Sequence, residues 1–290
     1  MEKLISIIIP TFNRDSLIKQ SISSILSQTY TNFEVIVVDD CSTDNTEQVV
    51  KSIHDERIKY VKLQEKSGAG IARNCGLKIA KGEIVAFEDS DDIWENNKLL
   101  IQINEMEREQ ARASFCQYIK YDYETNRMIE HIPSASFNKK YASFEELMLA
   151  NFIGTPCLMG YREDFLEIEF DEHLPRFQDW DFVLRLAQRN KILYIDKPLV
   201  KAYVQKDSIT RNPEWGIIAL ETIYNKNLNY LKQNPKAESQ IHLRLGDFYF
   251  EAKKSPVDEY KKSLMLDFSI RKLEKYITAK LNILHYFYGK

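Results

Sequence analysis

The chain has 290 residues, of which 44% are hydrophobic and 29% are charged. These proportions are ordinary for a globular protein and argue against a largely disordered chain. The formal net charge of -3 excludes the strongly basic surface that is typical of nucleic-acid-binding proteins. The four cysteines form no CxxC pair, which indicates neither a zinc site nor a disulfide framework. No stretch approaches the roughly 18 apolar residues that span a bilayer, so we expect a cytoplasmic protein.

Four short apolar runs alternate with helical patterns in the first 90 residues. The runs are Leu4–Pro10, Phe33–Val38, Ile58–Leu63 and Ile84–Phe87. Each is too short for a buried helix and is typical of a strand. Helices are expected after Asp15, whose side chain would cap the first of them, after Ser42 and after Gly68. Strands that alternate with helices predict a parallel sheet covered by helices on both faces.

The pattern changes after a helix predicted at Glu95–Gln110. The further expected elements are a strand at Ala113–Tyr123, a capping box at Ser143–Glu146, a strand at Thr155–Tyr161, a helix at Asp179–Arg189 and short strands at Ile192–Ile195 and Leu199–Val204. From Trp215 onward the pattern is helical to the end. We therefore expect a helical C-terminal region behind the α/β part.

Acidic residues follow two of the predicted strands. Asp39 and Asp40 end the second strand, and Asp89 and Asp91 come directly after the fourth. Ligands of such sheets bind beyond the carboxyl ends of the strands. Two carboxylates one residue apart can share a hard divalent cation, which often completes its shell with substrate phosphates. The alternative is that these acids only cap helices, as Asp92 would for the helix that follows.

Two other polar positions also fit a site for an anionic ligand. Arg73 stands near the start of a helix after two glycines, where a guanidinium and backbone N–H groups can meet an anion; the alternative is a surface salt bridge. Asp179 and Asp181 lie at the start of a later helix. A carboxylate there can take a proton from a hydroxyl group, and the helix N-terminus helps to keep it ionised. One of these two aspartates is expected to be only an N-cap.

Six segments, in this order, resemble glycosyltransferase family 2. The segments are Ser6–Asn13, Ser24–Tyr30, Val37–Asp44, Ala72–Gly76, Gly82–Trp94 and Asp179–Asp181. The resemblance covers roughly residues 4–210 and implies an α/β fold, with a GT-A-type nucleotide-binding sheet that has helices on both faces, plus an α-helical C-terminal region. It also implies a donor-binding half over 1–110, an acceptor-binding and catalytic-base half over 111–212, and a helical extension over 213–290.

The resemblance implies roles for the matching residues. Pro10, Thr11 and Asn13 would lie where the first strand meets the nucleotide. Asp40 would recognise the base, usually uracil, and Arg73 would approach the nucleotide.

The same resemblance implies the reacting groups. Asp89 and Asp91 would hold Mn²⁺ or Mg²⁺ and the diphosphate, with Asp91 as the direct metal ligand. Asp179 would be the general base of a single in-line displacement that inverts the anomeric carbon. The implied enzyme is a metal-dependent glycosyltransferase that moves a sugar from a nucleotide diphosphate sugar, a UDP-sugar, to an acceptor hydroxyl.

Three positions depart from the family pattern. Cys41 stands where the family often has Gly, and Gln178 stands where an acidic residue commonly precedes the base. Gln205 occupies a place where many relatives carry a His that reaches the metal. A third protein ligand for the metal is therefore in question.

The absence of a Gln-x-x-Arg-Trp motif favours a non-processive enzyme that acts on a glycan or a lipid-linked glycan in bacterial surface polysaccharide synthesis. Two alternatives stay open. A nucleotidyltransferase would normally carry a Gly-rich loop after the first strand, and Thr11–Asp15 has no glycine. The other is a non-catalytic nucleotide-sugar binding partner in a glycan assembly complex.

The C-terminal stretch carries a basic amphipathic pattern. Ile270, Leu273, Ile277, Leu281 and Leu284 recur at helical spacing beside several lysines, and Tyr286–Tyr288 follow. Such a helix can rest on the inner face of the cell membrane. The alternative is that the stripe packs on the chain's own core or on a second copy in a homodimer.

Overall fold

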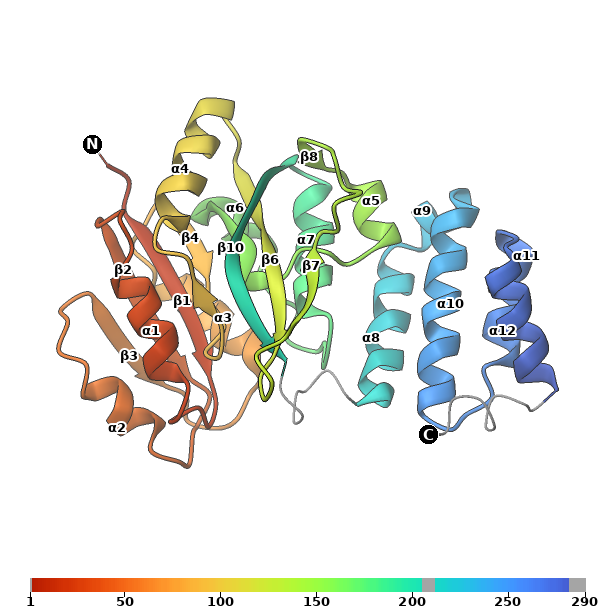
Figure 1. The fold of residues 1–290 in the computed structure, drawn as a ribbon, viewed down its shortest axis with the longest axis horizontal. Helices are drawn as coiled ribbons and strands as arrows, with labels where there is room; N and C mark the ends of the chain where they lie inside the picture. Colours follow the sequence, from red (N-terminus) through yellow and green to blue (C-terminus); the bar gives the residue numbers. More distant parts are fainter. Residues whose placement is uncertain (1, 205–211, 282–290) are drawn as a thin grey trace. The chain divides into compact units, whose positions relative to one another are not determined.

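The computed structural model describes residues 2–204 and 212–281, and the chain divides into two compact units (Figure 1). The sheet unit comprises the described residues of Met1–Leu147, Asn151–Glu172 and Gln178–Lys206. The helical unit comprises those of Met148–Ala150, His173–Phe177 and Asp207–Lys290. The division predicted at residues 110 and 212 stays a prediction.

The first half of the sheet unit has four parallel strands in the order β3-β2-β1-β4. They are β1 (Ile5–Thr11), β2 (Phe33–Asp39), β3 (Ile58–Lys62) and β4 (Ile84–Phe87), joined by α1 (Ile18–Leu26), α2 (Thr46–Lys51) and α3 (Ala69–Ile79). All residues of β1 and β4 are buried, as expected for strands of a parallel sheet covered on both faces. The carboxyl ends of these strands meet at one edge, where the acidic residues lie.

Helix α3 packs closely against β1. A Cβ atom on Gly76 would come within 2.4 Å of Cγ2 of Ile8, so this contact requires glycine. Ala72 and Leu77 on the same helix are fully buried. The position of α3, and of any functional side chain on it, is therefore fixed by packing against the sheet.

The parallel order predicted from the first 90 residues is confirmed in the first half, whereas the second half of the sheet is mixed. The added strands are β5 (Ile93–Trp94), β6 (Ala113–Asp122), β7 (Met128–Ile132), β8 (Tyr141–Ala142), β9 (Leu158–Tyr161) and β10 (Ile192–Val204). Strand β9 runs antiparallel between β4 and β6, and β10 is parallel to β6. The order continues β4-β9-β6-β10-β5, with β7 on β6 and β8 on β10.

Five helical segments complete the elements around this half of the sheet. They are α4 (Lys98–Glu109), α5 (Phe144–Leu149), the short 3₁₀ helix Thr155–Cys157, α6 (Arg162–Ile168) and α7 (Gln178–Ala187). Phe87 of β4 packs at centroid distances of 5.7 Å from Phe165 and 6.1 Å from Phe182. Stacking of Phe170 on Phe182, at 4.2 Å, extends this aromatic core and fixes the N-terminal part of α7 relative to β4.

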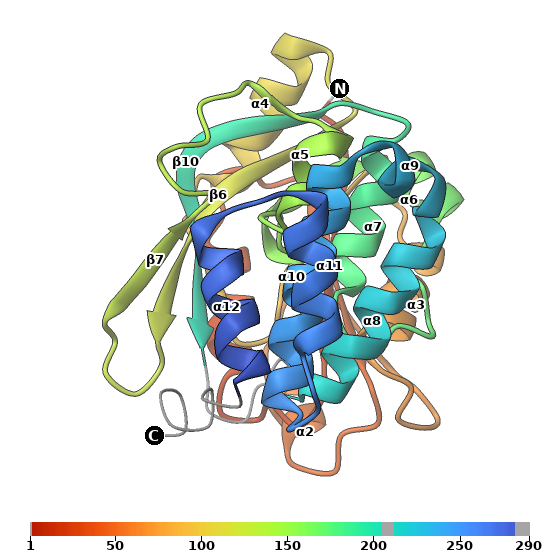
Figure 2. The same cartoon turned by 90° about the vertical axis from the view of Figure 1, so that its right-hand side faces the viewer.

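The helical unit contains α8 (Pro213–Lys226), α9 (Leu228–Gln233), α10 (Pro235–Glu251), α11 (Val257–Leu266) and α12 (Ile270–Lys280). Helix α10 packs between α8 and α11, and α12 packs on α11 (Figures 1 and 2). The expected helical C-terminal region is confirmed. Among residues 2–204 and 212–281, no helix is both long and apolar enough to cross a membrane.

Helix α12 packs on its own unit through Ala279 and Tyr276 and through a polar contact of Lys272, while most of its apolar stripe points elsewhere. The Lys272 amino group is buried and donates to Ser239 Oγ at 2.9 Å. Ile270, Ile277 and Leu281 are 70%, 44% and 60% exposed, so these three residues of the stripe do not pack into the core of the described residues. The rest of the stripe, from Leu284 on, lies outside the residues that the structure describes.

Candidate active site

The carboxyl end of β2 carries two buried aspartates with different contacts. Asp39 accepts a hydrogen bond from the Ser42 N–H at 2.7 Å and another from the Tyr60 hydroxyl. Asp40 accepts from the Ser67 N–H at 2.6 Å and the Gly68 N–H at 2.8 Å. Asp40 therefore joins the end of β2 to the loop that starts α3. A carboxylate has about four acceptor positions, so these two hydrogen bonds leave Asp40 able to accept from a ligand. Contact of Asp40 with a nucleotide base stays a prediction.

The first strand ends in a loop held by its neighbour. Asn13 has a left-handed backbone (φ 51°), which Asn tolerates better than most residues. Its N–H donates to Ser42 Oγ at 2.9 Å, and its side-chain oxygen accepts from the Thr43 N–H at 2.9 Å. Pro10 and Thr11 are buried at the end of β1, and Thr11 Oγ1 has no hydrogen-bond partner among the described residues. Asn13 thus joins the loop after β1 to the loop after β2.

Arg73 and Asp89, which the sequence places in different elements, form an ion pair of 2.7 Å. Arg73 is 7% exposed on α3, and its guanidinium lies 5.5 Å from the centre of the Phe170 ring. The alternative of a salt bridge is confirmed as a contact, but its arginine is buried and does not lie on the surface. The pair fixes the Asp89 carboxylate at the end of β4.

Asp91 lies beside this pair and lines a cavity of about 260 Å³. Burial and the charge of Asp89 raise the pKa of Asp91 to about 6, although the Arg14 guanidinium, 3.7 Å away, lowers it. Tyr123 and Tyr203 line the same cavity. Excess negative charge is therefore concentrated at a site that small ligands can enter.

Two further acids in this loop, Glu88 and Asp92, are buried, and Asp92 also lines the cavity beside Asp91. Glu88 accepts from the Asp89 N–H at 3.0 Å, and burial together with the charge of Asp92 raises the pKa of Glu88. Asp92 accepts from the Tyr203 N–H at 3.2 Å. Asp92 does not cap the next helix, because α4 begins after Asn97. It joins the acidic loop to β10.

Asp179 is the second residue of α7 and accepts hydrogen bonds from the Trp180 N–H at 2.8 Å and from the Asn151 amide at 3.4 Å. Burial raises the pKa of Asp179, the two hydrogen bonds and the charge of Arg73 lower it, and Asp89 raises it further. Because the charges of Arg73 and Asp89 both act on Asp179, the three side chains belong to the same site.

Asp181 has a different role from Asp179. It is 2% exposed and pairs with Arg185 at 2.7 Å, and Arg185 also donates to the Ile168 and Glu169 carbonyl groups. Asp181 therefore anchors α7 to the end of α6. The expectation that one of the two aspartates is only an N-cap is wrong, because both lie inside α7 and Asp181 forms an i,i+4 pair.

The structure thus brings Arg73, Asp89, Asp91 and Asp179 together, and links Asp40 to them through the first turn of α3. Sequence reasoning missed Arg14 and Asn151, which contact Asp91 and Asp179 from distant segments. No group of three or more His, Cys, Asp or Glu side chains suited to a metal occurs among the described residues. Gln205, the position in question as a third ligand, lies outside them.

A comparison with known protein families identifies the family of this chain. A family model described as "Glycosyl transferase family 2" matches residues 6–168. The match spans β1 to α6 and includes the whole acidic loop. The chain belongs to glycosyl transferase family 2. The resemblance seen in the sequence is confirmed.

Curated relatives within the family differ from this chain in length. An uncharacterized glycosyltransferase of Rickettsia bellii is 35% identical over 232 residues, which cover 78% of this chain and 33% of that protein. An Escherichia coli protein, the UDP-Glc:alpha-D-GlcNAc-diphosphoundecaprenol beta-1,3-glucosyltransferase WfaP, is 42% identical over 136 residues, 47% of this chain and 54% of that protein. The chain therefore spans about a third to a half of the length of these relatives.

A solved structure shares the fold. The mannosyltransferase PcManGT of Pyrobaculum calidifontis, in complex with GDP-Man and Mn²⁺, superposes with a TM-score of 0.66 at 19% identity, over 100% of this chain and 82% of that one. This likeness confirms the α/β fold of the GT-A type with its helical C-terminal region. The backbone of Cys41 has φ 66°, a conformation that favours glycine, which is the residue that the family pattern leads one to expect at this position.

Proposed function

We propose that this chain is an inverting, non-processive glycosyltransferase that moves a sugar from a UDP-sugar to an acceptor hydroxyl with the help of Mn²⁺ or Mg²⁺. One observation carries the proposal. Arg73 holds Asp89 at 2.7 Å beside Asp91, and the pKa of Asp179 responds to both Arg73 and Asp89. These contacts support the proposal that the two acids which would hold the cation and the carboxylate which would act as base work in one site.

The residues present fit a divalent cation. Asp89 is compensated by Arg73, and Asp91, two residues on, turns its carboxylate to the lining of the cavity beside that pair. A hard cation prefers such carboxylate oxygens and takes further ligands from water and substrate phosphates. When bound, the cation acts as a Lewis acid that neutralises charge on the leaving diphosphate. Asp91 is accordingly the proposed direct ligand, with Asp89 as its neighbour.

The remaining chemistry belongs to the chain's own side chains. Pro10, Thr11 and Asn13 form the loop on which we place the nucleotide, and Asp40 is the proposed contact for the base. The buried Arg73 guanidinium orients Asp89 and adds positive charge where the diphosphate would develop negative charge.

Asp179 is the proposed general base. Its carboxylate would take the proton of the acceptor hydroxyl as the oxygen attacks the anomeric carbon from the face opposite the nucleotide, which inverts that carbon. Asn151 and the Trp180 N–H hold the carboxylate in place, while burial keeps it more basic than an exposed aspartate. Asp179→Asn should retain donor binding, and transfer should fall by about 10²–10⁴-fold.

Donor and acceptor classes come from the relatives. WfaP is named for UDP-glucose and a lipid-linked diphosphate acceptor, so we propose a UDP-sugar donor, a glycan or lipid-linked glycan acceptor, and a place in bacterial surface polysaccharide synthesis. The exposed apolar stripe of α12 is a proposed contact to the inner face of a membrane or to a second copy. Liposome flotation of the full chain and of a chain that ends near Arg271 tests this contact, and equal flotation would reject the membrane.

The products of donor turnover decide between this function and its two alternatives. The chain is incubated with UDP-sugars and Mn²⁺, with and without EDTA. Release of UDP supports a glycosyltransferase, release of pyrophosphate a nucleotidyltransferase, and release of neither a binding partner. Asp179→Asn is compared with Asp196→Asn, which changes an exposed carboxylate of β10. Loss of transfer in both variants, or in neither, would remove Asp179 as the base.

A further inference from the structure

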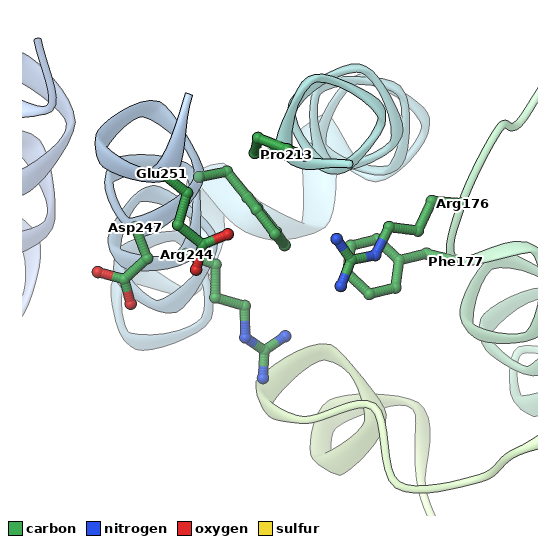
Figure 3. Close-up of a pocket in the computed structure, with 7 residues that line it drawn as sticks. Arg176, Phe177, Pro213, Arg244, Asp247 and Glu251 are labelled. Atoms are coloured by element: carbon green, nitrogen blue, oxygen red, sulfur yellow. The ribbon is translucent and has the colours of Figure 1, made fainter. Parts of the chain in front are cut away.

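The helical unit contains a pocket of about 710 Å³ that shares no residue with the acidic site (Figure 3). Arg176 and Phe177 form one side of it, and Pro213 opens α8 at its rim. The other side is a row on α10 with helical spacing, made of Arg244, Asp247, Phe248 and Glu251. This volume lies within the range of ordinary small-molecule sites.

Two aromatic rings give the pocket an apolar surface in a fixed position. The rings of Phe177 and Phe248 lie 6.0 Å apart, and the Arg176 guanidinium lies 4.7 Å from each ring centre. A Cβ atom on Gly216 would come within 2.8 Å of the Phe248 ring, so α8 closely abuts that ring. Packing therefore holds the Phe248 ring in place.

The backbone of Phe177 adds an independent sign of function. Its φ of 58° is unusual for a bulky residue, and such strain persists only where surrounding contacts enforce it. Strained residues of this kind cluster at ligand-binding positions. The Phe177 ring lies beside the Arg176 guanidinium, as Figure 3 shows.

The polar groups around the rings are also held in position. Arg244 donates to the Leu149 carbonyl at 2.8 Å. Asp247 accepts from the Tyr260 hydroxyl at 2.7 Å and pairs with Lys275. Glu251 is exposed at the end of α10. The pocket thus combines two guanidinium groups and two carboxylates with two rings.

This combination fits a polyhydroxylated ligand better than the other common classes. An apolar peptide would remove water from four charged side chains and offer them no polar group in exchange, which is costly, and a simple anion would meet two carboxylates. Sugar hydroxyls accept from guanidinium groups and donate to carboxylates, and the C–H face of a sugar ring packs on aromatic rings. We propose that this pocket binds a sugar residue of a glycan and, resting on the proposed function, that this glycan is the acceptor.

A glycan array of bacterial surface oligosaccharides tests the binding without any donor. The wild-type chain should bind at least one glycan, and titration calorimetry with that glycan gives its Kd. Glu251→Gln, which keeps the size of the side chain, should weaken binding about tenfold or more, as for one lost hydrogen bond to a charged group. Phe248→Leu should weaken it as well. Asp258→Asn, an exposed carboxylate on α11, is the matched control and should bind like the wild type.

Two measurements separate this proposal from the proposed function. Donor hydrolysis to UDP should be unchanged in Glu251→Gln. A wild-type chain that binds a glycan but releases no UDP would refute the proposed function and leave the glycan site standing. Thermal unfolding checks that the variants are folded. Absence of any glycan binding by the wild type, or binding that Glu251→Gln and Phe248→Leu leave unchanged, would overturn the pocket as a glycan site.

Discussion

Replacing Arg73 by Gln removes one partner of the ion pair that orders the acidic loop. At 2.7 Å, the Coulomb attraction of the pair is about 6 kcal/mol for an effective dielectric constant of ~20. Desolvation of both groups offsets much of this gain. Loss of one partner costs about 3–5 kcal/mol for a fully buried pair and roughly 0–1 kcal/mol for an exposed one. The Arg73 and Asp89 side chains are 9% and 33% exposed, so we expect a loss of about 2 kcal/mol.

A loss of this size should lower the Tm of the sheet unit by about 4–8 °C. Fluorescence of the buried Trp94 and Trp180 reports on this unit when Trp215, in the helical unit, is replaced by Phe in all variants. Arg108→Gln is the control, because Arg108 is 65% exposed in its pair with Glu105; its Tm should hardly change.

A double-mutant cycle with Asp89→Asn isolates the interaction of the pair. Residues in direct contact typically show coupling of about 0.5–3 kcal/mol, and we expect about 1–2 kcal/mol here. Donor turnover should fall in both single variants, because either change frees the carboxylate loop from α3. Additive effects of Arg73→Gln and Asp89→Asn on unfolding would refute the reasoning that Arg73 acts by holding Asp89.

Three further outcomes are expected. Burial raises the pKa of Glu88, so the folded protein loses this proton at a higher pH than the unfolded chain does. The free energy of unfolding should therefore fall as the pH rises through the raised pKa, by up to ~1.4 kcal/mol per pH unit. Glu88→Gln should remove this part of the slope and be more stable than the wild type at pH 8 in urea unfolding. Cys41→Gly should stabilise the chain by about 0.5–1 kcal/mol by relieving a positive φ, whereas Cys75→Gly inside α3 should destabilise it, by about 0.3 kcal/mol from helix propensity alone. Since burial raises the pKa of Asp179, kcat/KM should fall on acidification at a higher pH than for an exposed aspartate, and a pH-independent rate down to pH 4 would contradict its role.

Local signals predicted the elements that short-range chemistry determines. The capping box at Ser143–Glu146 forms as expected, with the Ser143 N–H donating to Glu146 and the Glu146 N–H to Ser143 Oγ. The predicted N-cap at Asp15 is wrong: α1 begins at Ile18, and the Asp15 N–H donates to Asp44 instead. The capping signal failed because the Leu17 and Ile18 N–H groups, which a cap at Asp15 would serve, donate to the Arg14 carbonyl.

The second half of the sheet was less predictable. Ile192–Val204 is one strand with register shifts between Ile195 and Val200, where the sequence suggested two. Strand β7 was missed, since Met128 and Ile129 are more than half exposed and carry no buried-strand pattern. Pairing with β6, not local hydrophobicity, creates this strand.

Sequence motifs identified the acidic pair and Asp179, because each follows a strand or begins a helix. They did not reveal Asn151, which reaches Asp179 from a loop 28 residues earlier in the chain, or the Arg14 contact with Asp91. Such partners are brought together only by the packing of α7 and the first loop around the sheet.

The central claim is that Asp91 provides a cation site for the departing nucleotide. UDP release from a UDP-sugar is measured against Mn²⁺ concentration for the wild type and Asp91→Asn, with EDTA as the metal-free reference. The wild-type rate should rise to saturation with Mn²⁺, and Asp91→Asn should lose about two orders of magnitude or more, in line with several kcal/mol of charge stabilisation. Wild-type rates in EDTA, or in Asp91→Asn at any Mn²⁺ concentration, would contradict the claim.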